Sequence, residues 1–94
     1  NVYLDPEQRK EALVLSQSLQ AAKQLIAGGE RNVAKIKDFI KEVISRSPQA
    51  RIEYVEIYDA QDLGDVAEIK DQALIALAVK FGSTRLIDNL LVEV

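Results

Sequence analysis

The segment 73–94 constrains the fold most, because it is predicted to form two β-strands joined by a tight turn. Its first apolar run, 73–79, is too short to cross a membrane, and Gly82-Ser83 separates it from a second apolar run. A glycine at the first of two loop positions supplies the positive φ of a type II′ hairpin turn. The turn therefore pairs Phe81 with Thr84, and this pair sets the register of all the cross-strand pairs farther from the turn.

This register gives the predicted hairpin two unlike faces. Large apolar side chains gather on one face, which we assign to the core: Ile75, Leu77, Val79, Phe81, Leu86 and Leu90. Smaller or more polar residues gather on the other: Ala76, Ala78, Ile87 and Asn89, with the basic pair Lys80 and Arg85 at the tip. We therefore expect the second face to be covered by water or by a partner.

Two helices are predicted ahead of the hairpin. The first begins at Asp5-Pro6, a capping residue followed by a proline at the first helical position, with Gln8 placed as in a capping box. It ends at Gly28-Gly29, since glycine adopts the left-handed conformation at a helix C-terminus without strain. The second helix extends from about residue 32 to residue 45, and Pro48 stops it. So short a connection predicts antiparallel packing.

A third strand is predicted over 51–58, a segment rich in β-branched and aromatic residues. Its apolar residues fall on both faces, which is typical of an inner strand or of a strand whose outer face meets another surface. Residues 59–64 are typical of one capped helical turn, whereas 66–72 suits either a short strand or a packed loop. The predicted fold class is α+β, with two N-terminal helices packed on one face of a three-stranded, mainly antiparallel sheet that ends in a β-hairpin, and 1–94 forms a single domain.

The composition argues against several kinds of chemistry. The 94 residues include no Cys, His, Met or Trp, so thiolate and imidazole catalysis and the common zinc sites are not expected. The spacing of Asp59, Asp62 and Asp65 is not that of a calcium loop. Glu53 and Glu56 would lie on opposite faces of a regular strand, so they cannot work as an acid and base pair. We expect no catalytic residue and no metal site in this chain.

The charge of the chain limits its partners in a similar way. A net charge of −3 argues against nucleic acid, which would favour a basic surface. No apolar run approaches about 20 residues, so no membrane partner is expected. The absence of cysteine fits a reducing compartment.

Three charged residues of the hairpin are candidates for contact with another surface. Lys80 and Arg85 lie directly opposite each other and repel weakly, which hints at an anionic neighbour, although two side chains pointing into water explain the pair as well. Asp88 falls on the core face opposite Leu77. This position predicts either an ion pair with a cation such as Arg85 or Arg51, or a bulge that moves the carboxylate outward.

Three stretches of the chain resemble the C-terminal part of the pantothenate synthetases, also called pantoate–β-alanine ligases. They are Asn-Val-Tyr-Leu at 1–4 with Arg9, Ile-Glu-Tyr-Val-Glu-Ile at 52–57 with Asp59, and Gly-Ser-Thr-Arg-Leu-Ile-Asp-Asn at 82–89. Their order and intervals agree with that family across essentially the whole chain. Glu53 stands where the family usually has Asp before the strand tyrosine, a difference that puts little in doubt.

The resemblance implies a cytoplasmic enzyme that makes pantothenate from pantoate and β-alanine with ATP and Mg²⁺, through a pantoyl adenylate. In that family the catalytic residues lie in an N-terminal Rossmann-like domain with His-x-Gly-His and Met-Ser-Ser-Arg signatures, and Asn1 matches the residue that follows the second signature. The chain would then be a lid over the nucleotide site, inactive alone, binding no cofactor itself and partnered by the N-terminal domain. Lys80, Arg85 and Asp88 would be its interdomain contacts. A homodimeric parent is compatible with the resemblance.

A second hypothesis is an autonomous interaction or self-association module that uses the exposed face of the hairpin. The sequence upstream of Asn1 discriminates between the two. A Met-Ser-Ser-Arg ending favours the lid, and a start codon at that point favours the module. A first residue other than Met suggests a fragment or a processed chain.

Overall fold

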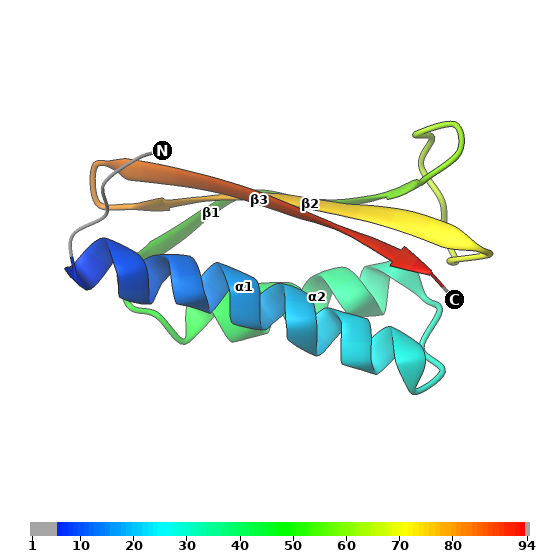
Figure 1. The fold of residues 1–94 in the computed structure, drawn as a ribbon, viewed down its shortest axis with the longest axis horizontal. Helices are drawn as coiled ribbons and strands as arrows, with labels where there is room; N and C mark the ends of the chain where they lie inside the picture. The colour runs from blue at the N-terminus through cyan, green and yellow to red at the C-terminus, as the bar shows by residue number, and fades with distance from the viewer. Residues whose placement is uncertain (1–5, 94) are drawn as a thin grey trace.

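The computed structural model describes residues 6–93, which form two helices and a three-stranded sheet in two layers (Figure 1). In chain order the elements are α1 (Pro6–Ala27), α2 (Val33–Ser45), β1 (Ala50–Asp59), β2 (Gln72–Phe81) and β3 (Thr84–Glu93). Both helices cover the same face of the sheet. The predicted α+β fold class is therefore confirmed.

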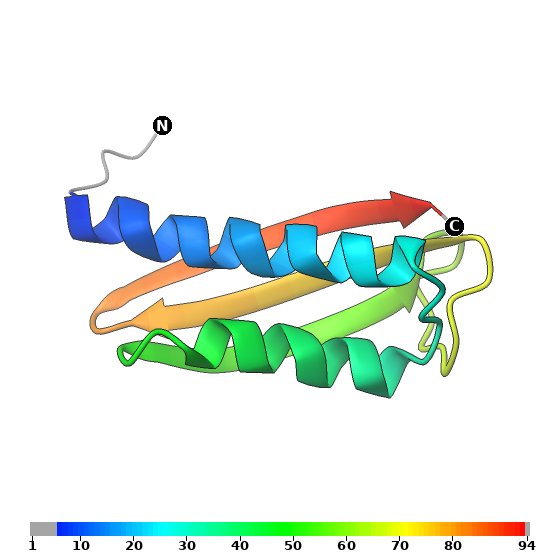
Figure 2. The same cartoon turned by 90° about the horizontal axis from the view of Figure 1, so that it is seen from below.

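The C-terminus of α1 and the N-terminus of α2 are formed by the residues that the sequence predicts. Gly29 adopts φ +117 after the last turn of α1, and its N–H donates to the carbonyl of Ile26 at 3.0 Å. Asn32 is the N-cap of α2 rather than its first residue, and its side-chain oxygen accepts a hydrogen bond from the N–H of Lys35 at 3.1 Å. The helices run antiparallel, as Figure 2 shows. The predicted cap Asp5 lies outside the described residues, as does the side chain of Gln8.

The sheet is antiparallel with the order β1-β2-β3. The hairpin has the predicted register, with Phe81 opposite Thr84 and an unbroken ladder from that pair to Gln72 and Glu93. Gly82 takes φ +61 and Ser83 has no positive φ, which agrees with a type II′ turn. The local turn thus positions the whole of β2 against β3.

Of the two alternatives for the strand at 51–58, the inner position is wrong, because β2 is the central strand and β1 forms an edge. Its register against β2 also shifts between Ile52 and Tyr54, so Glu53 is an extra residue in a β-bulge. Val55 and Ile57 point toward the helices and are buried, whereas Tyr54 and Tyr58 point the other way. β1 therefore has apolar residues on both faces because the side of the sheet away from the helices also carries apolar side chains, and not because β1 is an inner strand.

The hydrophobic core lies between the helices and the sheet. It is built from alternate residues of β2 and from one stripe of each helix, with smaller contributions from β1 and β3. Its fully buried members include Leu15 and Ile26 of α1, Ile36, Ile40 and Ile44 of α2, and Ile75, Leu77 and Val79 of β2. Leu86 and Leu90 are half-buried and pack against this core, so the assignment of the core face is confirmed.

The loop between β1 and β2 lies at the end of the domain opposite the β2–β3 turn (Figure 1). Asp59 caps its first turn, accepting from the N–H of Gln61 at 2.8 Å, while the N–H of Leu63 donates to the carbonyl of Asp59 at 2.8 Å. This is a single turn, as predicted. The ambiguous segment 66–72 begins as a packed loop in which Ile69 is buried and donates its N–H to the carbonyl of Arg31 at 3.0 Å. The loop is thereby fixed to the connection between the helices.

Gly82→Val is expected to lower the free energy of unfolding by about 1–3 kcal/mol, because a β-branched residue tolerates positive φ poorly. Nothing lies within 4 Å of a Cβ added at Gly82, so the loss comes from the backbone conformation and not from a clash. Gly82→Asn is the control, since Asn adopts positive φ more readily. Urea denaturation measures both variants, and an equal loss for Val and Asn would contradict the turn assignment.

Candidate functional site

The candidate functional surface is the face of the sheet that points away from the helices, which we call the open face (Figure 1). No described helix covers it. Alternate residues of the three strands supply its side chains: Arg51, Tyr54, Glu56 and Tyr58 from β1, Leu74, Ala76, Ala78 and Lys80 from β2, and Arg85, Ile87, Asn89 and Leu91 from β3. The composition of this face decides what it can contact.

Much of the open face is apolar. Ile87 is 57% exposed and Leu91 is 56% exposed, and both belong to β3. Ala78 is 0% exposed although it lies outside the core cluster, and its cross-strand neighbours are Tyr54 of β1 and Ile87 of β3. Tyr54, Ala78 and Ile87 form a continuous apolar row across the sheet. Tyr58, Leu74 and Leu91 form a second apolar row. The row between the two consists of Glu56, Ala76 and Asn89, of which Glu56 reaches past the edge of β1 to Lys37 of α2.

Three cations form one row across the end of the open face nearest the hairpin turn. Arg51 pairs with Lys80, and Lys80 pairs with Arg85. Arg85 donates from Nε to the carboxylate of Glu53, and this ion pair raises the pKa of the guanidinium through hydrogen bonding first and charge attraction second. Glu53 thus offsets one of the three positive charges. Sequence reasoning found Lys80 and Arg85 but missed Arg51 as the third member.

Arg51 and Lys80 are exposed, and neither forms an ion pair with another residue in the part of the chain that the structure describes. Together with Gly82 and the turn after α2 they line a shallow hollow of about 380 Å³. Two like charges beside one hollow favour an anion over a cation as its neighbour. The row is therefore the most strongly charged feature of the open face.

Asp88 differs from both predicted alternatives. It lies opposite Leu77 as expected, half-buried on the helix side, and no bulge interrupts β3. No ion pair with Arg85 or Arg51 forms, because Arg85 binds Glu53 on the other side of the sheet. The Asp88 carboxylate instead accepts a hydrogen bond from the N–H of Asn89 at 2.8 Å. The structure therefore places Asp88 away from the cationic row.

Glu53 and Glu56 do not alternate between faces as a regular strand requires, because Glu53 occupies the bulge. The assumption of a regular strand was wrong. Each carboxylate has its own cation: Glu53 binds Arg85, and Glu56 lies 3.5 Å from Nζ of Lys37 on α2. Each ion pair thus connects β1 to another element, β3 for Glu53 and α2 for Glu56.

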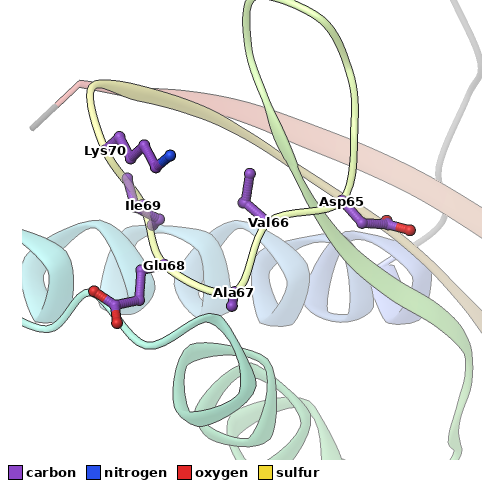
Figure 3. Close-up of a pocket in the computed structure, with 6 residues that line it drawn as sticks. All are labelled: Asp65, Val66, Ala67, Glu68, Ile69 and Lys70. Carbon is purple, nitrogen blue, oxygen red and sulfur yellow. The ribbon is translucent and has the colours of Figure 1, made fainter.

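The loop before β2 forms a hollow of about 500 Å³ that is lined by residues 65–70 (Figure 3). The carboxylates of Asp65 and Glu68 point in opposite directions there, so the side chains do not converge on one point. Among the residues that the structure describes, no three His, Cys, Asp or Glu are placed to hold a metal ion. Asp59 and Asp62 accept hydrogen bonds from the backbone of their own loop. The carboxylates around this hollow therefore do not form a convergent set of ligands for Mg²⁺.

The chain matches known proteins along its whole length. The model of the pantoate-beta-alanine ligase family matches residues 1–91. A pantothenate synthetase from Acetivibrio thermocellus is 54% identical over 94 residues, which cover 100% of this chain and 34% of that protein. One from Syntrophomonas wolfei is 51% identical over 94 residues and is covered to 33%. The chain thus spans about a third of the length of these relatives.

The fold agrees with the same family. A crystal structure of pantothenate synthetase from Thermus thermophilus superimposes with a TM-score of 0.82 at 34% identity, over 96% of this chain and 32% of that one. None of the described helices is long and apolar enough to cross a membrane. The hypothesis of an autonomous interaction module finds no support among these relatives, which are biosynthetic enzymes of about three times this length.

Proposed function

Because the chain belongs to the pantoate-beta-alanine ligase family, we propose that it is the C-terminal domain of a cytoplasmic enzyme that joins pantoate to β-alanine at the expense of ATP. The observation that carries this proposal is the 54% identity over 94 residues with a pantothenate synthetase. ATP and Mg²⁺ would bind to the remaining two thirds of the enzyme.

We further propose that the domain acts as a lid over the nucleotide site of the preceding domain. We expect no catalytic group in this domain, so its contribution to the reaction would come from position. α1 begins in the helix layer at the same end of the molecule as the β2–β3 turn (Figures 1 and 2), so a preceding domain would attach at the end of the molecule that carries the cationic row. Closure at that end would exclude water from an acyl adenylate that otherwise hydrolyses.

Of the three residues proposed as interdomain contacts, Lys80 fits that role best. It is exposed, and no described residue neutralises it. Arg85 and Asp88 both have partners inside the domain, namely the Glu53 carboxylate and the Asn89 N–H. Arg51 joins Lys80 in the hollow beside the turn. We therefore assign the contact with an anion of the preceding domain or its substrates to Arg51 and Lys80.

The full-length enzyme is expected to form pantothenate with release of pyrophosphate, whereas the isolated 94-residue chain is expected neither to do so nor to bind ATP. The reason is that the sequence contains no His, no phosphate-binding loop and no paired acid and base. Calorimetric titration with ATP and Mg²⁺ measures binding to the isolated chain, with the full-length enzyme as the positive control. A micromolar dissociation constant for the isolated chain, equivalent to about −8 kcal/mol, would overturn the assignment.

A further inference from the structure

We propose that the outer edge of β3 is able to pair with the same edge of a second copy of the chain, and that the carboxylate of Asp88 prevents this pairing. The outer edge is the side of β3 that faces away from β2 (Figure 2). The inference goes beyond the proposed function, because it concerns association of the enzyme and not its reaction. It rests on the direction of the backbone groups along β3 and on one hydrogen bond near the middle of the strand.

Alternate residues of β3 direct their backbone groups away from the sheet. The β2–β3 turn joins Phe81 to Thr84, and the first and last residues of such a turn are hydrogen-bonded to each other. Along an antiparallel pair of strands, hydrogen-bonded pairs alternate with pairs that are not hydrogen-bonded. The residues whose N–H and C=O groups point outward are therefore Arg85, Ile87, Asn89, Leu91 and Glu93. No other strand within residues 6–93 pairs with this side of β3.

β3 lacks most of the features that protect edge strands from pairing. The other edge strand, β1, is interrupted by the bulge at Glu53, whereas the register of β3 against β2 is unbroken over all 10 residues. β3 contains no proline and no lysine, and two of its outward residues, Ile87 and Leu91, are exposed apolar residues. A long and regular edge of this kind favours pairing with another strand.

Asp88 supplies the missing protection near the middle of β3. Its side chain is half-buried on the helix side of the sheet, and its Oδ1 accepts a hydrogen bond from the N–H of Asn89 at 2.8 Å. That N–H is one of the outward groups, so Asp88 occupies a donor that an approaching strand would need. An inward-pointing charged residue is one of the means by which edge strands avoid pairing. Pairing here would break a hydrogen bond to a carboxylate, which is stronger than one between neutral groups.

The residue order of β3 identifies a second copy of the chain as the partner. When two β3 strands run antiparallel with Asn89 on the two-fold axis, Arg85 lies opposite the second copy's Glu93. In the same register, Ile87 lies opposite the second copy's Leu91. Opposite charges then meet at both ends of the pairing, and apolar side chains meet between them. Because each copy uses the same edge, the contact closes into a dimer and does not extend into a fibre.

Disulfide trapping in the full-length enzyme tests the proposal, after any cysteines in the rest of the enzyme have been replaced. Asn89→Cys places a thiol on the two-fold axis, where the two opposed Cα atoms would be about 5.5 Å apart, a separation that a disulfide spans. With Asp88→Ala added, we expect copper phenanthroline to form a covalent dimer about tenfold or more faster than with Asn89→Cys alone. Asp88→Ala with Leu91→Cys is the matched control, because its two thiols would lie about 13 Å apart along the strands.

Asp88→Asn with Asn89→Cys is the conservative variant, since the amide oxygen of asparagine still accepts from the N–H of residue 89. We expect it to cross-link as slowly as Asn89→Cys alone, and equally fast reaction with Asp88→Ala would show that the hydrogen bond is not the barrier. Slow cross-linking of every variant would show that the edge does not pair. Equal rates for thiols at positions 89 and 91 would contradict the proposed register. None of these readouts depends on pantothenate formation, so their failure is distinct from a failure of the proposed function.

Discussion

Leu77→Ala is expected to lower the free energy of unfolding of the domain by about 2–5 kcal/mol. Leu77 is 0% exposed and lies in the middle of the central strand, between Val55 of β1 and Asp88 of β3. Hydrogen-bonded strands on both sides and the helix layer above prevent the structure from collapsing into the cavity. Since domains of this size are stable by only about 5–15 kcal/mol, the loss is a large fraction of the total.

Leu13→Ala removes the same atoms from a side chain that is 56% exposed, and it is the matched control. We expect it to change the free energy of unfolding by no more than about 0.5 kcal/mol, because the lost side chain was largely in water already. Urea denaturation of the isolated domain measures both variants. Similar midpoints for the two would show that β2 is not the centre of the core.

The hairpin could be predicted from the sequence because a local turn determines it. Gly82 and Ser83 fix a two-residue connection, and a two-residue connection fixes which residues of β2 and β3 face each other. The alternation of large and small residues along β2 then identifies the core face. The helix ends could be predicted for the same reason, since Gly29 and Asn32 act on backbone groups within a few residues of themselves.

The position of β1 could not be predicted in this way. A loop of about a dozen residues joins it to β2, so no tight turn sets its register, and the bulge at Glu53 has no local signal. The ion pair between Glu53 and Arg85 and the alignment of Arg51 with Lys80 both depend on that register. The candidate site was therefore predicted on β3 and the tip of β2, and its β1 part was missed.

Asp88 shows a different limit. The register correctly placed it on the helix side, and the energetic argument that a half-buried carboxylate needs a partner was also sound. The partner is the N–H of Asn89, the next residue, and not a distant cation. A short side chain can form a hydrogen bond with the adjacent backbone whenever the local conformation allows it. The alternation of residues along a strand does not predict such a bond.

Arg51→Glu combined with Lys80→Glu is expected to lower kcat/KM for pantoate in the full-length enzyme about tenfold, which corresponds to about 1.4 kcal/mol of lost stabilisation in the closed state. The two cations share a hollow beside the turn and have no described anionic partner, so the proposed closure brings them to an anion. Arg85 is left unchanged because its replacement would also deprive Glu53 of its cation. The stability of the isolated domain should change by no more than about 0.5 kcal/mol per site, since both side chains are exposed.

Lys23→Glu with Lys35→Glu is the matched control, because it makes the same change in net charge on exposed positions of the helix layer. We expect this variant to keep normal kinetics. We also expect the deficit of the Arg51 and Lys80 variant to be smaller at high salt, because ions screen an exposed charge contact over a Debye length of about 3 Å at 1 M. Equal kinetics for the two double variants would show that the cationic row contacts only water in the closed state. The lid would then have to act through its apolar contacts alone.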